Sequence, residues 1–303
     1  MGPVSGLSVG LDIGATKTLG LVIDDAGEIL AEVREATEPG SDGVVRTAAR
    51  VVEALRAATG QPLTGTVGVG MPGLVDHEKG TVKYAVNLGL EGDWFPLGDL
   101  LSDRLGVPVV VENDVNAATL GAVAMSGEDD LVYVSIGTGL AGGLVLDGRL
   151  RRGEHGAAGE IGHIPVDPHG VLCTCGQRGC LETLASGSAI AAAWPGSGSV
   201  PPAQALFAAA LSGDPDAIAA RDRFATGVAE AIRVLSLAVD PRTIVLGGGV
   251  AQLGEQLRVA VANALLDQAA SSPFLASLEL AGRLRVVPSS YPVAAVGAAL
   301  LGR

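Results

Sequence analysis

Basic and aromatic residues are scarce in this 303-residue chain. It carries 20 lysines and arginines against 33 aspartates and glutamates, which gives a formal net charge of −13. A surface of this sign repels a phosphate backbone, so we expect no nucleic-acid partner. Aromatic residues make up only 3% of the chain. The apolar content therefore rests on alanine, valine and leucine, which suits the close packing of helices and sheets in an α/β protein.

Long apolar runs and a recognisable leader are also missing. No uninterrupted apolar stretch approaches the length that spans a bilayer, and no basic segment precedes an apolar run near the first residue. We therefore expect a cytoplasmic protein without a membrane partner. The length is comfortable for two lobes of ordinary size, so a cleft between lobes is available.

Cysteine is rare, but the three residues present are gathered in one segment with the pattern C-x-C-G-x-x-G-C. An odd number of thiols cannot pair completely as disulfides, and close spacing is typical of a tetrahedral metal site, with zinc the expected ion. The alternative is a loop of buried, reduced thiols. The thiols are those of Cys173, Cys175 and Cys180, and spacing alone does not choose the fourth ligand among His155, His163 and His169.

A duplicated hairpin indicates the fold class. Residues 7–34 read as a β-meander, and residues 131–153 repeat its pattern at a constant offset of 123 positions, so that Ile13-Gly14 corresponds to Ile136-Gly137. Buried strands are expected at 66–69, 107–111 and 243–246, and helices at 42–59, 222–239 and 292–301. This alternation predicts an α/β protein with two ribonuclease-H-like lobes of the actin and hexokinase type and a cleft between them.

The two hairpin turns are candidate phosphate-binding loops. Glycine-rich turns present backbone N–H groups without obstruction, and two such turns facing each other can hold the β- and γ-phosphates of ATP. A single turn of this kind is weak evidence, because glycine joins most hairpins. The expected nucleotide-binding residues are Gly14, Thr16 and Lys17 in the first turn and Gly137, Thr138 and Gly139 in the second.

Two aspartates are placed to assist phosphoryl transfer. Asp12, at the end of the first strand, can orient Mg²⁺ through water, although an Asx-turn or a cap would explain it equally. Asp114 follows a buried strand and precedes a helix, the position at which open α/β sheets place their sites. A kinase needs a carboxylate there to accept the proton of the attacking hydroxyl. The alternative for Asp114 is a helix N-cap.

Several of these segments resemble signatures of the ROK family (repressor, open reading frame, kinase), a group of bacterial sugar kinases and sugar-responsive repressors. The matching strings are E-x-G-H from Glu160, C-x-C-G-x-x-G-C-x-E from Cys173 and E-N-D-x-N from Glu112. The resemblance implies His163 as the fourth zinc ligand and Asp114 as the general base. It also implies nucleotide contacts from Gly247, Gly248 and Gly249, and a sugar pocket formed by Asn87, Asn113, Asp114, Glu160, His163 and Glu182.

The resemblance further implies how the chain is divided and what it acts on. The small lobe would comprise residues 1–113 with 289–303, because the C-terminal helix crosses back, and the large lobe would comprise residues 114–288. The implied activity is ATP-dependent phosphorylation of a hexose at the 6-hydroxyl with Mg²⁺ and a structural Zn²⁺, by a homodimer or homotetramer. Glucose is the expected substrate, with N-acetylglucosamine, N-acetylmannosamine, mannose and fructose as alternatives.

Three positions depart from the kinase pattern. Ala15 and Ala141 stand where many kinase members have glycine, and the segment 87–94 is longer than the family's usual spacing between asparagine and tryptophan. A sugar-sensing regulator is therefore the competing interpretation. Repressor members carry a helix-turn-helix before the first strand, whereas only about six residues precede it here. We therefore expect a kinase.

Overall fold

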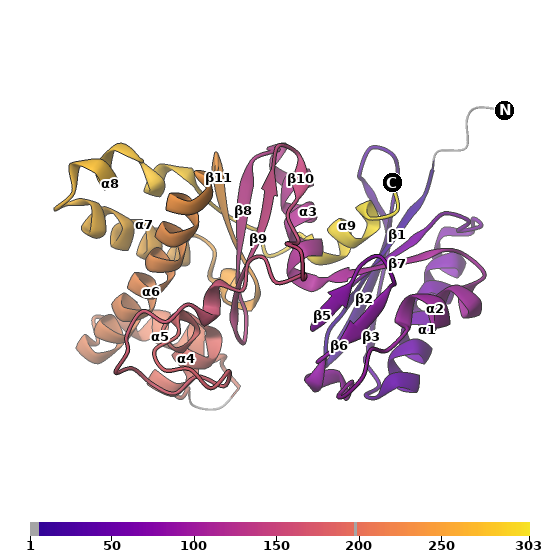
Figure 1. The fold of residues 1–303 in the computed structure, drawn as a ribbon, viewed down its shortest axis with the longest axis horizontal. Coiled ribbons are helices and arrows are strands. Elements are labelled where there is room, and N and C mark those ends of the chain that lie inside the picture. Colours follow the sequence, from indigo (N-terminus) through magenta and orange to yellow (C-terminus); the bar gives the residue numbers. More distant parts are fainter. Residues whose placement is uncertain (1–5, 197–198) are drawn as a thin grey trace. The chain divides into compact units, whose positions relative to one another are not determined.

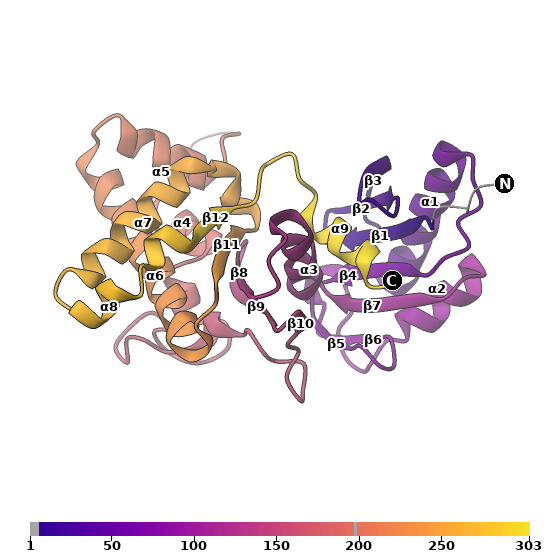
Figure 2. The same ribbon diagram turned by 90° about the horizontal axis from the view of Figure 1, so that it is seen from above.

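The computed structural model describes residues 6–196 and 199–303, which form two compact units (Figures 1 and 2). Unit 1 contains the described residues up to Gly127, together with Leu150–Ala157 and Pro292–Arg303. Unit 2 contains Glu128–Arg149 and Ala158–Tyr291. Within the described ranges, no helix combines the length and apolar content needed to cross a membrane.

Unit 1 is built on a five-stranded mixed sheet with the strand order β3-β2-β1-β4-β7. β1, β2 and β3 form an antiparallel meander, whereas β1, β4 and β7 run parallel. The elements of this unit are β1 (Ser8–Ile13), β2 (Lys17–Ile23), β3 (Ile29–Ala36), α1 (Ser41–Thr59), β4 (Val67–Met71), β5 (Leu74–Asp76), β6 (Thr81–Lys83), η1 (Val86–Leu88), α2 (Leu97–Leu105), β7 (Val109–Asn113), α3 (Asp114–Ser126) and α9 (Val293–Leu300).

Two helical layers cover this sheet. α1 packs on β2 and β3 and places Val44, Val51 and Leu55 in the core, then ends at Gly60, whose left-handed conformation lets its N–H bond to the carbonyl of Arg56. α9 packs on β1, β4 and α3, and Figure 2 shows it alongside them. The C-terminal helix therefore crosses back to the first unit, as the family resemblance predicted.

Glycines permit the close approach of α9. A Cβ built on Gly10 of β1 would lie 2.0 Å from the carbonyl oxygen of Ala295, and one on Gly68 of β4 would lie 1.8 Å from that of Ala298. A Cβ on Gly297 of α9 would meet the carbonyl oxygen of Ala117 in α3 at 1.7 Å. Each contact is shorter than any real Cβ contact, so helix and strands pack backbone against backbone here.

Unit 2 repeats the same sheet with the order β10-β9-β8-β11-β12. β8 and β9 match β1 and β2 at the predicted offset, and β8, β11 and β12 run parallel. The prediction of two ribonuclease-H-like lobes is confirmed. The elements are β8 (Leu131–Ile136), β9 (Leu140–Leu146), β10 (Arg149–Leu150), η2 (Ile161–His163), η3 (Leu181–Thr183), α4 (Gly187–Ala193), α5 (Pro202–Leu211), α6 (Pro215–Val239), β11 (Thr243–Gly247), η4 (Gly249–Leu253), α7 (Glu255–Ala269), α8 (Pro273–Ser277), η5 (Leu280–Arg283) and β12 (Leu284–Val286).

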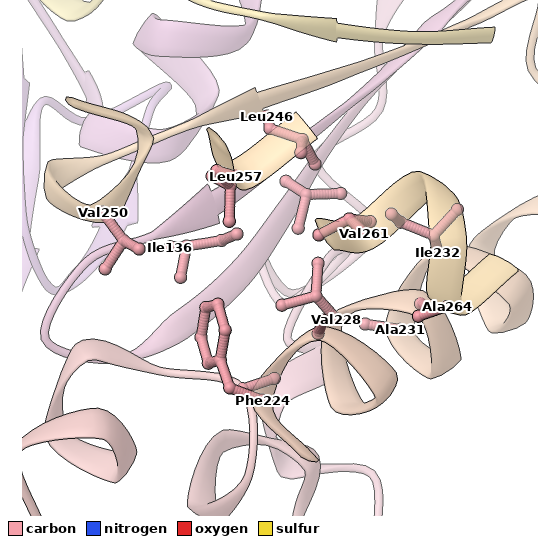
Figure 3. Close-up of a cluster of buried hydrophobic side chains, with 14 of the residues drawn as sticks. Ile136, Phe224, Val228, Ala231, Ile232, Leu246, Val250, Leu257, Val261 and Ala264 are labelled. Carbon is pink, nitrogen blue, oxygen red and sulfur yellow. The ribbon is translucent and has the colours of Figure 1, made fainter. Parts of the chain in front are cut away.

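The core of unit 2 lies between its sheet and the helices α6 and α7. Figure 3 shows Phe224 and Val228 of α6 near Ile136 of β8, with Val261 of α7 close by. All four side chains are almost fully buried. Phe224 also makes an edge-to-face contact with Phe207 of α5, the ring centroids being 6.4 Å apart. Small alanines elsewhere on α6 and α7 let the two helices approach each other.

The division between the units differs from the predicted boundary. We predicted it before Asp114, whereas the chain divides after Gly127, because α3 packs on α9 and stays with the first sheet. A second difference is the short segment Leu150–Ala157, which belongs to unit 1 although the chain on both sides of it belongs to unit 2.

Candidate active site

The E-N-D-x-N string forms the junction between β7 and α3. Asn113 is the N-cap of α3, because its Oδ1 accepts hydrogen bonds from the backbone N–H groups of Val115 (2.9 Å) and Asn116 (3.2 Å). Its Nδ2 donates to the carbonyl of Gly73 at 3.1 Å. Asp114 is the first helical residue, and it is partly exposed. The helix-cap explanation considered for Asp114 therefore applies to Asn113 instead.

Asp12 and Asp114 lie near each other at the carboxyl edge of the parallel strands. Asp12 of β1 pairs in register with Gly70 of β4, and a Cβ built on Gly70 would lie 3.7 Å from the Cα of Asp114. Burial and, to a smaller extent, the nearby carboxylate of Asp114 raise the pKa of Asp12 to about 6, while Lys17 lowers it. Two carboxyl groups at this edge are the ligands that Mg²⁺ prefers.

The first hairpin turn is held by bonds inside unit 1. The N–H of Gly14 donates to the carbonyl of Lys17 at 2.9 Å, and the Thr37 hydroxyl donates to the Gly14 carbonyl at 2.7 Å. Thr16 and Lys17 are exposed. Ala15 does not have a positive φ, so its methyl group causes no backbone strain.

The second turn is held in a similar way inside unit 2. The N–H of Gly137 donates to the carbonyl of Gly139 at 3.0 Å, and the N–H of Gly187 at the start of α4 donates to the carbonyl of Gly137 at 2.8 Å. Thr138 is exposed. Ala141 also lacks a positive φ. The two departures from the glycine pattern are therefore compatible with both turns.

Glu182 connects the second turn to the cysteine segment. Its Oε2 accepts the backbone N–H of Leu140 at 3.1 Å, and its Oε1 lies 3.9 Å from the Sγ of Cys173. A Cβ built on Gly139 would lie 2.4 Å from the same Oε2, so the carboxylate would have to move if this position carried a side chain. Glu182 was predicted to bind the sugar, and the structure adds a contact to the second hairpin turn.

The sequence-predicted metal ligands come together in unit 2. One donor atom from each of four residues lies within 4.8 Å of all the others, and the four are His163, Cys173, Cys175 and Cys180. The Sγ atoms of Cys175 and Cys180 are 3.6 Å apart, and the Nδ1 of His163 lies 3.9 Å from the Sγ of Cys173. Tetrahedral zinc with bonds of about 2.3 Å to sulfur separates its sulfur ligands by about 3.8 Å. The donor set therefore fits zinc.

The pKa values of two of the thiols are shifted in opposite directions. Hydrogen bonds from Gln177 lower the pKa of the Cys175 thiol to about 6, and burial raises the pKa of Cys180 to about 12. Glycine permits the turn, because Gly176 and Gly179 have φ values of 92° and 66°. His155 and His169, the other candidate ligands, are exposed and outside the cluster.

The remaining predicted contacts lie at several places. Glu160 is about half exposed, with Oε2 3.9 Å from the Nε2 of His163. Asn87 is exposed on η1 in unit 1. Because Asn87, Asn113 and Asp114 belong to unit 1 while Glu160, His163 and Glu182 belong to unit 2, the shared sugar pocket stays a prediction.

The glycines after β11 have different roles. A Cβ on Gly247 would overlap the Tyr133 ring, its distance to the hydroxyl oxygen being 2.0 Å, and Gly248 has a φ of 82°. Packing and backbone conformation therefore account for both. Gly249 is exposed, with open space around a Cβ. Its predicted nucleotide contact stays a prediction, as do those of Gly247 and Gly248.

A buried ion pair beside Asp114 was not predicted. Glu112 accepts a hydrogen bond from the Nε of Arg152 at 2.6 Å, and the Nδ1 of His77 lies 3.4 Å from the same carboxylate. Glu112 lies within the E-N-D-x-N string, so its position could have drawn attention. No local pattern connects it with residues forty positions away in the sequence.

Comparison with known proteins gives one consistent result. The ROK family model matches residues 8–301. A glucokinase from Thermotoga maritima is 37% identical over 272 residues, covering 82% of this chain and 84% of that protein. An N-acetylmannosamine kinase from Yersinia pseudotuberculosis is 34% identical over 247 residues, covering 81% and 83% respectively.

A solved structure agrees over nearly the full length. The crystal structure of a ROK family glucokinase from Streptomyces griseus, in complex with glucose and AMPPNP, superposes with a TM-score of 0.80 at 33% identity. The match covers 98% of this chain and 99% of that one. The likeness therefore extends through both units rather than resting on the cysteine segment alone.

Proposed function

Since the chain belongs to the ROK family, we propose that it is an ATP-dependent kinase that phosphorylates a hexose at the 6-hydroxyl, with glucose as the first candidate. One observation carries the proposal. Asp12 and Asp114 meet at the carboxyl edge of three parallel strands, beside a hairpin turn with exposed Thr16 and Lys17. A regulator needs the sugar pocket but has no use for this pair of carboxylates. The glucokinase relatives support glucose as the substrate.

The residues of unit 1 would carry the chemistry. Asp114 would accept the proton of the 6-hydroxyl as the hydroxyl oxygen attacks the γ-phosphorus of ATP, while the bond from that phosphorus to the β,γ-bridging oxygen breaks and ADP leaves. Asp12 would orient Mg²⁺ through water, and the bound ion would neutralise charge on the β- and γ-phosphates. Lys17 and the hydroxyl of Thr16 would donate to the phosphates. Asn113 would keep one amide N–H for the sugar, since its other groups cap α3 and bind Gly73.

The residues of unit 2 would hold the sugar and the second side of the nucleotide. Glu160, His163 and Glu182 would bind hydroxyl groups, because carboxylates and imidazole exchange hydrogen bonds with neighbouring OH groups and an unmet partner is costly in a closed site. Thr138 and the following glycine would contact phosphate. A structural Zn²⁺ on His163 and the three thiolates would fix the loop that carries the sugar ligands.

The assembly and surroundings follow from the same family. We propose that the chain works in the cytoplasm as a homodimer or homotetramer and binds no nucleic acid, the last because of its net charge of −13. N-acetylmannosamine is the second candidate substrate, since a kinase for that sugar is 34% identical. N-acetylglucosamine, mannose and fructose follow. A sugar-sensing regulator is the remaining alternative.

The direct test is a coupled ADP-release assay over these five sugars with ATP and Mg²⁺. We expect turnover with glucose, and the highest kcat/KM of the panel for that sugar. A higher kcat/KM for an N-acetylated hexosamine would change the substrate and keep the kinase. Sugar binding by calorimetry without any ADP release would favour the regulator.

A further inference from the structure

Glu112 is an unusual residue for its position. Among the residues that the structure describes, it is the only charged one in the buried set, with 1% of its surface exposed. A buried carboxylate is costly unless it is paired and hydrogen-bonded, and a buried ion pair often contributes little net stability compared with apolar residues of the same volume. The stability of the fold alone is therefore a weak explanation for the ion pair between Glu112 and Arg152. Glu112 lies two residues before Asp114.

The two oxygens of Glu112 hold different parts of the structure. Oε1 accepts the backbone N–H of Asn113 at 3.0 Å and the Nδ2 of Asn116 at 3.0 Å, residues that lie on either side of Asp114 in the sequence. Oε2 accepts the Nε of Arg152 at 2.6 Å. His77, from the turn after β5, places its Nδ1 3.4 Å from Oε2. One carboxylate thus links the β7–α3 junction to two other segments.

Arg152 comes from the segment Leu150–Ala157. In the sequence this segment lies between two stretches of unit 2, but it packs as part of unit 1. The Arg152 side chain is 34% exposed and lines a pocket of about 600 Å³ together with His77, Trp94 and His155. Its Nε is committed to Glu112, so the guanidinium holds the inserted segment against the strand that leads to Asp114.

We propose that Glu112 and Arg152 are positioning residues for the base, and this inference rests on the proposed kinase function. The ion pair fixes the backbone of Asn113 and the side chain of Asn116, and these two set the direction of the first turn of α3. Asp114 is the first residue of that turn. A displacement of the Asp114 carboxylate by a fraction of an ångström affects proton transfer more than it affects sugar binding.

A double-mutant cycle tests this inference. The variants are Arg152→Met, Glu112→Gln and the double variant, with Arg149→Met as the control for loss of an exposed arginine nearby. Turnover is measured by ADP release, sugar affinity by calorimetry and folding by thermal denaturation. We expect Arg152→Met to lower kcat about 10- to 100-fold, the range typical of outer-shell partners, with a smaller change in sugar affinity.

The cycle also distinguishes positioning from general damage. Arg152→Met removes the arginine partner of a buried carboxylate, so adding Glu112→Gln should recover part of the lost turnover instead of multiplying the losses. Arg152→Lys, which keeps the positive charge, should retain more activity than Arg152→Met. Because Glu112 is buried, Arg152→Met should also lower the thermal stability, and Glu112→Gln should restore part of it, so turnover is compared at a temperature at which every variant is folded.

Three results would overturn the inference. The first is a kcat for Arg152→Met within about twofold of Arg149→Met, and the second is losses that simply multiply in the double variant. The third is a fall in sugar affinity equal to the fall in kcat. A wild-type chain without sugar-dependent ADP release would overturn the proposed function itself, whereas an active wild type with any of the three results overturns only the positioning role.

Discussion

Asp114 and Glu160 are both expected to touch the sugar, yet replacing them should affect different kinetic constants. Asp114→Asn keeps the shape and most hydrogen bonds but removes the base, so turnover should fall about 10²- to 10⁴-fold with a smaller change in sugar affinity. Glu160→Gln should weaken sugar binding more than turnover, because Glu160 holds hydroxyl groups. Turnover comes from coupled ADP release and affinity from calorimetry.

The structure makes the Asp114 result easier to interpret. Asn113 already caps α3, so a loss of activity in Asp114→Asn cannot be attributed to a missing N-cap. Near-native turnover of this variant would exclude Asp114 as the base, and the mechanism would need another proton acceptor. Equal effects of the two substitutions on affinity and turnover would contradict the separate roles.

Asp12 provides a prediction about stability and pH. Its pKa is about 6 in the folded protein against an ordinary value of 3.8, so the folded state holds the proton more tightly. The contribution of Asp12 to the stability should therefore fall as the pH rises from about 4 to about 6 and then level off. Asp12→Asn has no such proton, so its stability relative to wild type should increase over the same range by about 2 kcal/mol.

Urea denaturation at pH 4.5, 6 and 7.5 measures this difference. Any constant effect of the asparagine cancels, because only the change with pH is interpreted. Asp103→Asn, on the exposed surface of α2, controls for loss of one negative charge. A pH-independent difference between Asp12→Asn and wild type would show that burial does not hold the Asp12 proton.

At the scale of single elements, local sequence patterns predicted the strands and helices well, but they predicted poorly which of these elements pack against each other. The alternation in residues 7–34 and its repeat gave β1, β2, β8 and β9, because a hairpin is decided by neighbouring residues. The place of α3 could not be predicted in this way. It depends on Gly121 and Gly297, whose missing side chains let α3 and α9 pack backbone against backbone.

The same contrast holds for the site. The cluster of three cysteines was predictable because the thiols are close in sequence and the turn needs glycine at 176 and 179, whereas His163 was implied by the family resemblance. The Glu112–Arg152 pair and the contact from Glu182 to Leu140 join residues forty or more positions apart. Such contacts depend on the packing of whole segments, and no spacing in the sequence encodes them.

The cysteine loop gives the prediction at this scale. The purified protein should contain about one zinc per chain, and Cys175→Ser should remove it. Cys175 is exposed, so the substitution itself disturbs no core packing, and any loss of thermal stability reports on the metal. Because Glu182 lies between Cys173 and the N–H of Leu140, hydrogen exchange at Leu140 should also become faster.

Metal analysis by mass spectrometry, thermal denaturation and hydrogen exchange are the measurements. Thr174→Ala, between two ligands and also exposed, is the matched control and should retain the metal. A folded, active wild-type preparation without zinc would contradict the prediction of a structural zinc ion. Full zinc content in Cys175→Ser would remove that residue from the ligand set.

At the scale of the whole molecule, the duplication gives each unit the same sheet and a hairpin turn after its first strand. Unit 1 has Asp12 on β1 and Asp114 where β7 meets α3, whereas unit 2 has Glu160, the cysteine loop and Glu182 in the segment between β10 and α4. The different roles proposed for the two units therefore depend on these residues rather than on the sheets, which are alike.

The net charge decides the last prediction, which concerns DNA. With 33 acidic against 20 basic residues, the chain should repel a duplex at every distance shorter than the screening length of about 10 Å at 0.1 M salt. Its described helices and strands all belong to the two units. We therefore expect no binding of labelled genomic fragments in fluorescence anisotropy at physiological salt, with or without the sugar.

A basic DNA-binding protein serves as the positive control. Lower salt should not restore binding, because it lengthens the range of the repulsion. Retention of a particular fragment against excess competitor DNA would show that a local surface overrides the net charge, and it would return the regulator to first place among the candidate functions.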